Sequence, residues 1–164
     1  MKKVNISDLK WESLCSPKGK FQVSLKNISH AMGAPKDVGP PQGHAFAVTL
    51  HKIPPGKRDW PLHAHSQQTE FYIVMSGKGK MRVRVNDDTE VSEWLEPGDC
   101  IHCPPDGDAH QIQNSGDEDL VFWVIADNPS AESIYYPDSG KYAMKPERKW
   151  FRMQPVADYF DGEE

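Results

Sequence analysis

The chain has 164 residues, which is enough for one domain with a hydrophobic core, and 26% of them are charged. Its net charge of −5 lacks the basic balance of a general nucleic-acid binder, so we expect no nucleic-acid partner. The first residues lack the apolar stretch of a secretory signal and no window approaches a membrane-spanning run, so we expect a cytoplasmic protein without a membrane partner.

The beginning of the chain predicts a polar arm, two strands and a loop between them. Residues 1–20 are mostly polar, whereas residues 21–28 alternate apolar and polar side chains, which is typical of a half-buried strand. Residues 30–44 are rich in glycine and proline and predict a loop, and residues 45–53 predict the next strand.

A pair of histidines follows this second strand. His63 and His65 are one residue apart, so on a strand both side chains point to the same face, whereas a helix would turn them about 200° apart. Glu70 begins a β-branched and aromatic stretch that predicts another strand, which brings its carboxylate near the two imidazoles. Tyr72 shares the face of Glu70 and is a candidate for the cavity wall.

Short strands separated by turns rich in Gly, Pro, Asn and Asp continue through residue 127, a pattern typical of a β-sandwich or barrel. Strands are predicted at 62–65, 70–76, 80–85, 90–95, 100–103, 109–114 and 120–127. Arg82 and Arg84 share one face of their strand, which we interpret as exterior and solvated. If that face instead points inward, the two arginines would form an anion clamp.

The remaining histidines and the cysteines carry less weight. We expect the strand residues His51 and His102 to be packed, and His30 and His44 to lie in solvated loops. Cys100 and Cys103 have the spacing of a redox or zinc pair, but positions three apart on a strand lie on opposite faces. We therefore expect buried structural thiols. The third cysteine is Cys15, and an odd count of this kind predicts no disulfide framework.

A last polar candidate, His110, follows a turn punctuated by proline and glycine and begins a strand. Together with His63, His65 and Glu70 it offers three imidazoles and one carboxylate, a ligand set that suits Mn, Fe, Co, Ni, Cu or Zn.

The two polar stretches resemble the paired motifs of the cupins, G-x5-H-x-H-x3,4-E-x6-G and G-x5-P-x-G-x2-H-x3-N. The first motif is matched, with one extra residue before the first histidine, by Gly56, His63, His65, Glu70 and Gly77. The second is matched, with one extra residue after the proline, by Gly98, Pro104, Gly107, His110 and Asn114. The resemblance implies an all-β cupin double-stranded β-helix, or jelly-roll barrel, that holds one divalent transition metal on His63, His65, Glu70 and His110.

The C-terminal segment is less regular but rich in aromatic side chains, which are costly to leave in water. We expect it to pack on the barrel or on a second subunit, and we expect a homodimer. Its sequence YYPDSGK is similar to a sugar-phosphate-isomerase-like subgroup of single-domain bacterial cupins. We therefore predict one cupin domain over 1–164. It divides into an N-terminal arm and strand at 1–44, a barrel core at about 45–127, and a C-terminal extension at 128–164.

The resemblance implies a metal-dependent enzyme that acts on a small polar molecule. Its most concrete form is isomerisation of a sugar or sugar phosphate, with Tyr72 as a candidate for the proton shuttle. A mononuclear Fe(II) dioxygenase and a non-catalytic cupin that binds or senses a small molecule are the alternatives. The types of residue in the motifs do not separate these functions, and they name no general base.

Overall fold

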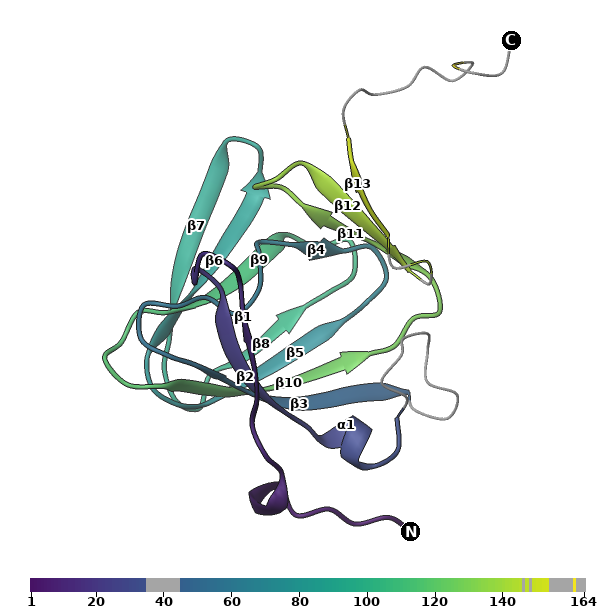
Figure 1. Cartoon of the computed structure of the whole chain (residues 1–164). Coiled ribbons are helices and arrows are strands. Elements are labelled where there is room, and N and C mark those ends of the chain that lie inside the picture. The colour runs from purple at the N-terminus through teal and green to yellow at the C-terminus, as the bar shows by residue number, and fades with distance from the viewer. Residues whose placement is uncertain (35–44, 146, 148, 154–160, 162–164) are drawn as a thin grey trace.

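The longest sheet of the molecule has six antiparallel strands and forms one wall of a barrel (Figure 1). Its order is β1-β2-β3-β10-β5-β8. The strands span Glu12–Cys15 (β1), Gln22–Asn27 (β2), Phe46–Ile53 (β3), Leu120–Asp127 (β10), Glu70–Ser76 (β5) and Cys100–Cys103 (β8). On β10, buried residues alternate with half-buried ones, as the two-residue period of a strand requires when one face covers a core.

Two smaller antiparallel sheets form the rest of the barrel (Figure 1). One has the order β7-β6-β9, with β7 at Thr89–Leu95, β6 at Gly79–Asn86 and β9 at Ala109–Asn114. The other has the order β13-β12-β11-β4, with strands at Lys149–Arg152, Lys141–Lys145, Glu132–Tyr136 and Ala64–His65. A backbone bridge between His63 and His110 joins the two sheets, so that β4 and β9 lie side by side.

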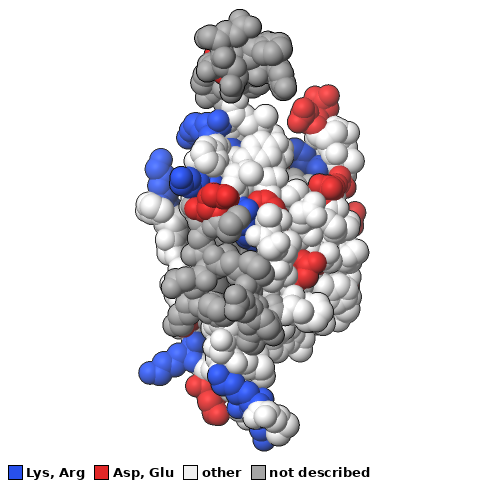
Figure 2. All heavy atoms as spheres, turned by 90° about the vertical axis from the view of Figure 1, so that its right-hand side faces the viewer, with Lys and Arg blue, Asp and Glu red and all other residues white. Residues whose placement is uncertain are grey.

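This computed structural model describes residues 1–34, 45–145, 147, 149–153 and 161. A 3-10 helix at Ile6–Asp8 and the short helix α1 at Ile28–Ala31 lie outside the barrel (Figure 1). Among these residues, no helix is long and apolar enough to cross a membrane. On the face shown in Figure 2, basic and acidic side chains of the described residues are interspersed.

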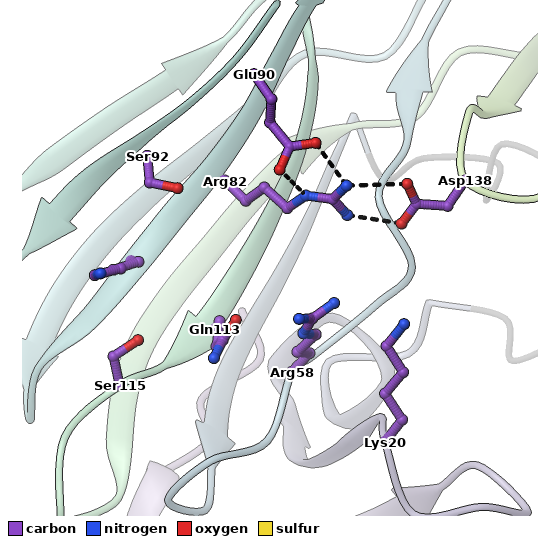
Figure 3. A pocket seen from close by; sticks show the side chains of 9 residues that line it. Lys20, Arg58, Arg82, Glu90, Ser92, Gln113, Ser115 and Asp138 are labelled. Atoms are coloured by element: carbon purple, nitrogen blue, oxygen red, sulfur yellow. Dashed lines mark hydrogen bonds and ion pairs between the residues drawn. The ribbon is translucent and has the colours of Figure 1, made fainter.

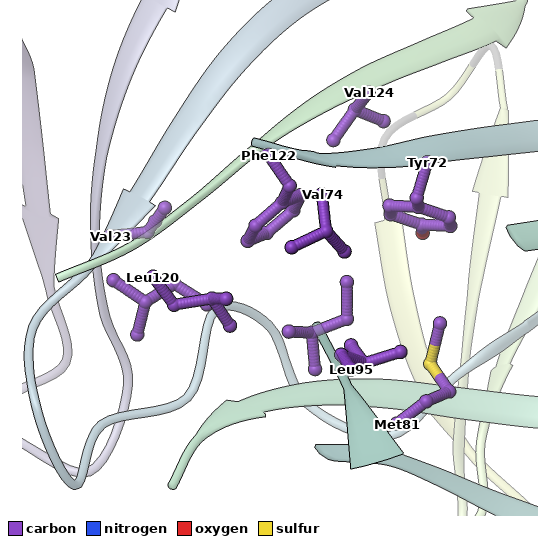
Figure 4. Close-up of a cluster of buried hydrophobic side chains, with 10 residues drawn as sticks. Val23, Tyr72, Val74, Met81, Leu95, Leu120, Phe122 and Val124 are labelled. Carbon is purple, nitrogen blue, oxygen red and sulfur yellow. The ribbon is translucent and has the colours of Figure 1, made fainter. Parts of the chain in front are cut away.

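The hydrophobic core fills the barrel between the six-stranded sheet and the three-stranded sheet β7-β6-β9 (Figure 4). It contains the fully buried Phe122 and Leu120 of β10 together with Val74 of β5 and Ile112 of β9. On both β5 and β9, the series of residues that face the core continues along the strand to a polar residue. On β5 the inward sequence is Val74, Tyr72, Glu70, and on β9 it is Asn114, Ile112, His110. The same alternation that builds the core therefore places Glu70 and His110 beside each other.

Gly77 shows why the first motif ends in a glycine. Its φ is +81°, in the left-handed region, and a Cβ atom added there would lie 2.5 Å from the carbonyl oxygen of Asp119. Only a residue without a side chain lets the turn after β5 pass so close to the segment that leads into β10.

The all-β fold is confirmed, and the strands predicted between 70 and 127 are all present. The strands that sequence reasoning missed are β1 and the three strands β11 to β13, which lie in the segments interpreted as arm and irregular extension. The two short helices before β3 were not predicted either. The strand predicted at 62–65 is shorter, since only Ala64 and His65 belong to β4. The loop predicted at 30–44 falls largely outside the described residues. The predicted domain limits stay a prediction.

The expectation of buried thiols at Cys100 and Cys103 is wrong for Cys100. Cys15 and Cys100 are exposed and Cys103 is half-buried. His102, expected to be packed, is exposed as well. The physical reason is that Cys100 and His102 lie opposite Ile73 and Phe71 on the outer face of the sheet. Because β8 is the edge strand, side chains from only one neighbouring strand cover that face. The predicted divergence of the two thiols is confirmed.

Candidate metal centre

Four side chains from three parts of the barrel meet at one end of the core. His63 precedes β4, His65 ends it, Glu70 begins β5 and His110 lies on β9. The backbones of His63 and His110 exchange two hydrogen bonds, from His63 N to His110 O at 3.2 Å and from His110 N to His63 O at 2.8 Å. The two rings therefore stand side by side, with their centroids 4.8 Å apart. All four residues that the motifs single out are brought together.

One carboxylate oxygen lies at the centre of the group. Glu70 Oε2 is 3.0 Å from His110 Nε2, 3.4 Å from His65 Nε2 and 3.7 Å from His63 Nε2. Ligand atoms of His63, Glu70 and His110 all lie within 4.8 Å of one another, and these three residues could hold a metal ion. The ring of His65 stands slightly apart, with its centroid 6.4 Å from that of His110.

Each imidazole is held in the orientation that a metal ligand needs. Nδ1 of His63 lies 2.8 Å from the carbonyl oxygen of Pro61, and Nδ1 of His110 lies 3.2 Å from that of Asp108. A carbonyl oxygen only accepts hydrogen bonds, so Nδ1 carries the proton in each ring. Nε2 is then the ring nitrogen that faces Glu70, and in its deprotonated form it would ligate a metal ion. Histidines that bind metals are oriented in this way.

His65 supplies a further observation in favour of a cation. Its Nε2 atom is buried and makes no hydrogen bond with any described residue, although Glu70 Oε2 is 3.4 Å away. A buried polar atom without a partner is unfavourable, whereas a metal ion would accept its lone pair. The donor set and this unpaired nitrogen therefore fit a divalent transition metal.

The electrostatics of the site favour an ionised carboxylate. Burial acts to raise the pKa of Glu70, but the favourable interaction of its carboxylate with the three surrounding imidazoles, first His110, outweighs it and holds the pKa well below its usual range. Burial likewise acts to lower the pKa of His110, yet its hydrogen bonds with Cys103 and Glu70 raise that pKa to about 10. A cation would take over the role of the His110 proton, so metal binding at neutral pH releases that proton.

Tyr72 lies where the strand pattern predicts, on the Glu70 side of the core. Its hydroxyl group donates a hydrogen bond to Glu70 Oε2 at 2.7 Å and lies 3.3 Å from His110 Nε2. Burial and the charge of Glu70 raise its pKa well above the ordinary value. The phenol therefore stays protonated and acts as a donor to the carboxylate.

Two further titratable groups are buried near this end of the core. His51 packs against Trp60 and Phe122, as predicted, and burial lowers its pKa to about 4. Asp59 is 3% exposed, and its Oδ1 accepts a hydrogen bond from Trp60 N at 2.6 Å. Its pKa is raised to about 7, first by burial and also by the charge of Glu70. No motif marks Asp59, so sequence reasoning missed it.

The remaining predictions concern histidines and arginines outside this site. His30 lies in α1 and is half-buried, and His44 lies outside the described residues. Arg82 and Arg84 lie on the exterior face of β6, as predicted, because the neighbouring Val83 pairs with His110 on the inner face. They are not simply solvated, however, because both form ion pairs with Glu90 and Asp138.

A profile of the cupin domain matches residues 49–126, which include all four residues of the group. This part of the chain is a cupin domain. A solved structure of a provisionally named sugar phosphate isomerase from Acidithiobacillus ferrooxidans superposes on this chain with a TM-score of 0.76. It is 26% identical, and the match covers 93% of this chain and 91% of that chain.

Two curated relatives also match the cupin. Auxin-binding protein 1 of Arabidopsis thaliana is 28% identical over 138 residues, which are 82% of this chain and 63% of that protein. Glucose-6-phosphate isomerase of Pyrococcus horikoshii is 35% identical over 66 residues, which are 39% of this chain and 33% of that enzyme. The chain thus spans less than two thirds of the length of both relatives.

Beyond the cupin domain, β11 adds a residue to the site that sequence reasoning missed. Glu132 is 5% exposed, and its Oε2 accepts hydrogen bonds from His65 Nδ1 at 3.0 Å and from Gln68 N at 3.2 Å. Its other oxygen pairs with Lys145 of β12. On the same strand Tyr136 stacks on His63, with centroids 6.2 Å apart and ring planes at 28°. The only signal in the sequence is the β-branched and aromatic content of residues 134–136, which favours a strand but does not name its partner.

Proposed function

We propose that this cupin is a metal-dependent enzyme that isomerises a sugar or sugar phosphate, with His63, His65, Glu70 and His110 as ligands of one divalent transition metal. The observation that carries the proposal is the convergence of three Nδ1-anchored imidazoles on one ionised carboxylate. The likenesses to two proteins named sugar phosphate isomerases support the class of substrate.

A bound metal would polarise the carbonyl oxygen and the neighbouring hydroxyl oxygen of the substrate, and so acidify the hydrogen on the hydroxyl-bearing carbon next to the carbonyl. Aldose–ketose isomerisation then needs a group that takes this proton and returns it to the neighbouring carbon. Asp59 meets the chemical requirement, because a carboxyl group with a pKa near 7 both accepts and donates a proton at neutral pH. Tyr72 meets it less well, since its raised pKa keeps the phenol protonated.

The chain's other residues would prepare the site for this step. Tyr72 holds Glu70 by its 2.7 Å hydrogen bond, and Glu132 holds His65 from the opposite side. Asp59 is buried and the Glu70 side chain is only 13% exposed, so little water reaches the site and each charge interaction is strengthened.

The test combines metal analysis with an isomerase assay. Protein purified without added metal, and then loaded with each divalent metal in turn, is assayed on a panel of aldose and ketose phosphates without O₂. We expect His63→Ala to lose both metal and turnover, and Asp59→Asn to lose turnover while it keeps the metal. If no substrate is converted with any metal, or if His63→Ala retains full metal content, the proposal fails. Activity that requires O₂ would assign the site to oxygenation.

A second candidate, binding of a small molecule without turnover, is favoured by the likeness to auxin-binding protein 1 over 82% of this chain. Saturable binding of a carboxylate or sugar ligand that depends on the metal, with no product formed, would select this function over catalysis.

A further inference from the structure

A cavity lies on the outside of the barrel, behind the sheet that carries His110. It has a volume of about 470 Å³, within the range of small-molecule sites. Lys80 and Arg82 of β6 line it together with Gln113 of β9. Because Val83 pairs with His110 on the inner face, these alternate residues point to the opposite side of the same sheet. The cavity is therefore separate from the candidate metal centre.

One wall of this outer cavity is an ion-pair network that is already neutral. Arg82 forms two hydrogen bonds with Glu90, at 2.7 and 2.6 Å, and two with Asp138, at 2.6 and 3.0 Å (Figure 3). Arg84 adds contacts to the same two carboxylates, at 3.2 and 2.9 Å. Two arginines thus balance two acids, and neither carboxylate is free to neutralise another cation.

Three other cations line the cavity without such a balance. Lys20, Arg58 and Lys80 have no carboxylate partner among the residues that the structure describes. Lys20 lies over the ring of Phe21, 5.3 Å from its centroid, and Lys80 lies over the ring of Trp94 at 4.2 Å. These contacts hold the side chains in place without cancelling their charge.

Arg58 is held more firmly. Its backbone bridges Phe21 on one side and Gln113 on the other, and its Nη1 donates to Gln111 Oε1 at 3.3 Å. Figure 3 shows the head groups of Arg58 and Lys20 extending in the same direction, toward the ion pair of Arg82 and Asp138. A guanidinium group fixed in this way keeps further N–H donors for a ligand.

We propose that this outer cavity is a second binding site, for the phosphate group of a small hydroxylated molecule. A phosphate dianion would offset the mutual repulsion of the three cations and accept their hydrogen bonds, which are stronger when both partners are charged. Ser92, Gln113 and Ser115 also line the space and offer hydroxyl and amide groups to the rest of the ligand. This cluster of unbalanced positive charges contrasts with the net charge of the whole chain, which is −5. It is independent of the reaction proposed above.

The test measures binding by isothermal titration calorimetry with the full chain carrying His63→Ala, which removes the candidate metal centre as a competing site. The ligands are inorganic phosphate, glycerol 3-phosphate and glycerol. We expect saturable binding of both phosphates, weakened by added salt, and none of glycerol. Tighter binding of the ester than of inorganic phosphate would assign a role to the hydroxyl contacts, and equal binding would identify a site for the free oxyanion.

The variants test the residues. Arg58→Gln with Lys80→Gln should weaken phosphate binding by at least about tenfold, because two charged hydrogen-bond donors are lost. Lys10→Gln, which removes one exposed charge elsewhere, is the matched control and should bind as before. Circular dichroism checks the fold, and if Arg58→Gln unfolds the chain, Lys20→Gln with Lys80→Gln replaces it. Absence of saturable phosphate binding, or undiminished binding in a folded variant, would overturn the proposal.

Discussion

Replacement of Glu132 by glutamine tests the link between β11 and the candidate metal centre. The carboxylate accepts from His65 Nδ1 at 3.0 Å, and its second oxygen pairs with Lys145. Glutamine keeps the shape but removes the charge and half of the accepting capacity, so His65 loses its fixed orientation and some basicity. Loss of such a partner costs about 10- to 100-fold in metal affinity, equivalent to about 1.4–2.8 kcal/mol.

The assay is a competition titration, in which a chromophoric chelator takes the metal from wild type and variant. Lys145→Gln is the matched control, because it breaks the same ion pair but leaves the oxygen that accepts from His65. We expect Glu132→Gln to lose affinity by about tenfold or more and Lys145→Gln to lose much less. If Glu132→Gln binds metal as tightly as wild type, or if both variants weaken equally, the reasoning about orientation is refuted.

Three further predictions follow from the buried groups and the surface. The pKa of Asp59 is raised from 3.8 to about 7, so its stabilising contribution is complete below pH 3.8 and is lost as the pH rises through 7. Asp59→Asn should therefore melt higher than wild type at pH 8 in scanning calorimetry, and a lower melting temperature would contradict this. Removing the metal with a chelator should lower the free energy of unfolding by about 2.7 kcal/mol relative to protein in free metal at 100 times its Kd. An unchanged melting temperature would argue against a metal. Trp150 and Phe151 on β13 are 61% and 50% exposed, so light scattering should give the mass of a homodimer, whereas a monomer mass would contradict this.

The inward-facing residues could be predicted from the sequence because strand geometry fixes them locally. His63 and His65 alternate with a residue between them, and Tyr72 follows Glu70 by two positions, so each pair shares a face whatever the partner strands are. The order of the two motifs then supplied the long-range contact between Glu70 and His110, which periodicity alone does not contain.

The features that the sequence did not predict depend instead on partners distant in the sequence. Cys100 is exposed because β8 is an edge strand, and nothing within residues 100–103 says which strand has a neighbour on only one side. Glu132 meets His65 because β11 pairs with the two-residue strand β4, with Ile134 opposite His65. Asp59 lies at a variable position of the first motif and outside any strand, and only burial distinguishes it from a solvated loop residue.

The pairing of β11 with β4 also bears on how much of this chain is required for its chemistry. A version that stopped at Asp127 would retain every proposed ligand, and alignment of such a fragment with other cupins would reveal nothing amiss. It would nevertheless lack the carboxylate that His65 donates to and the ring that lies on His63. The smallest piece recognisable by homology is thus smaller than the smallest piece able to hold its imidazoles in place.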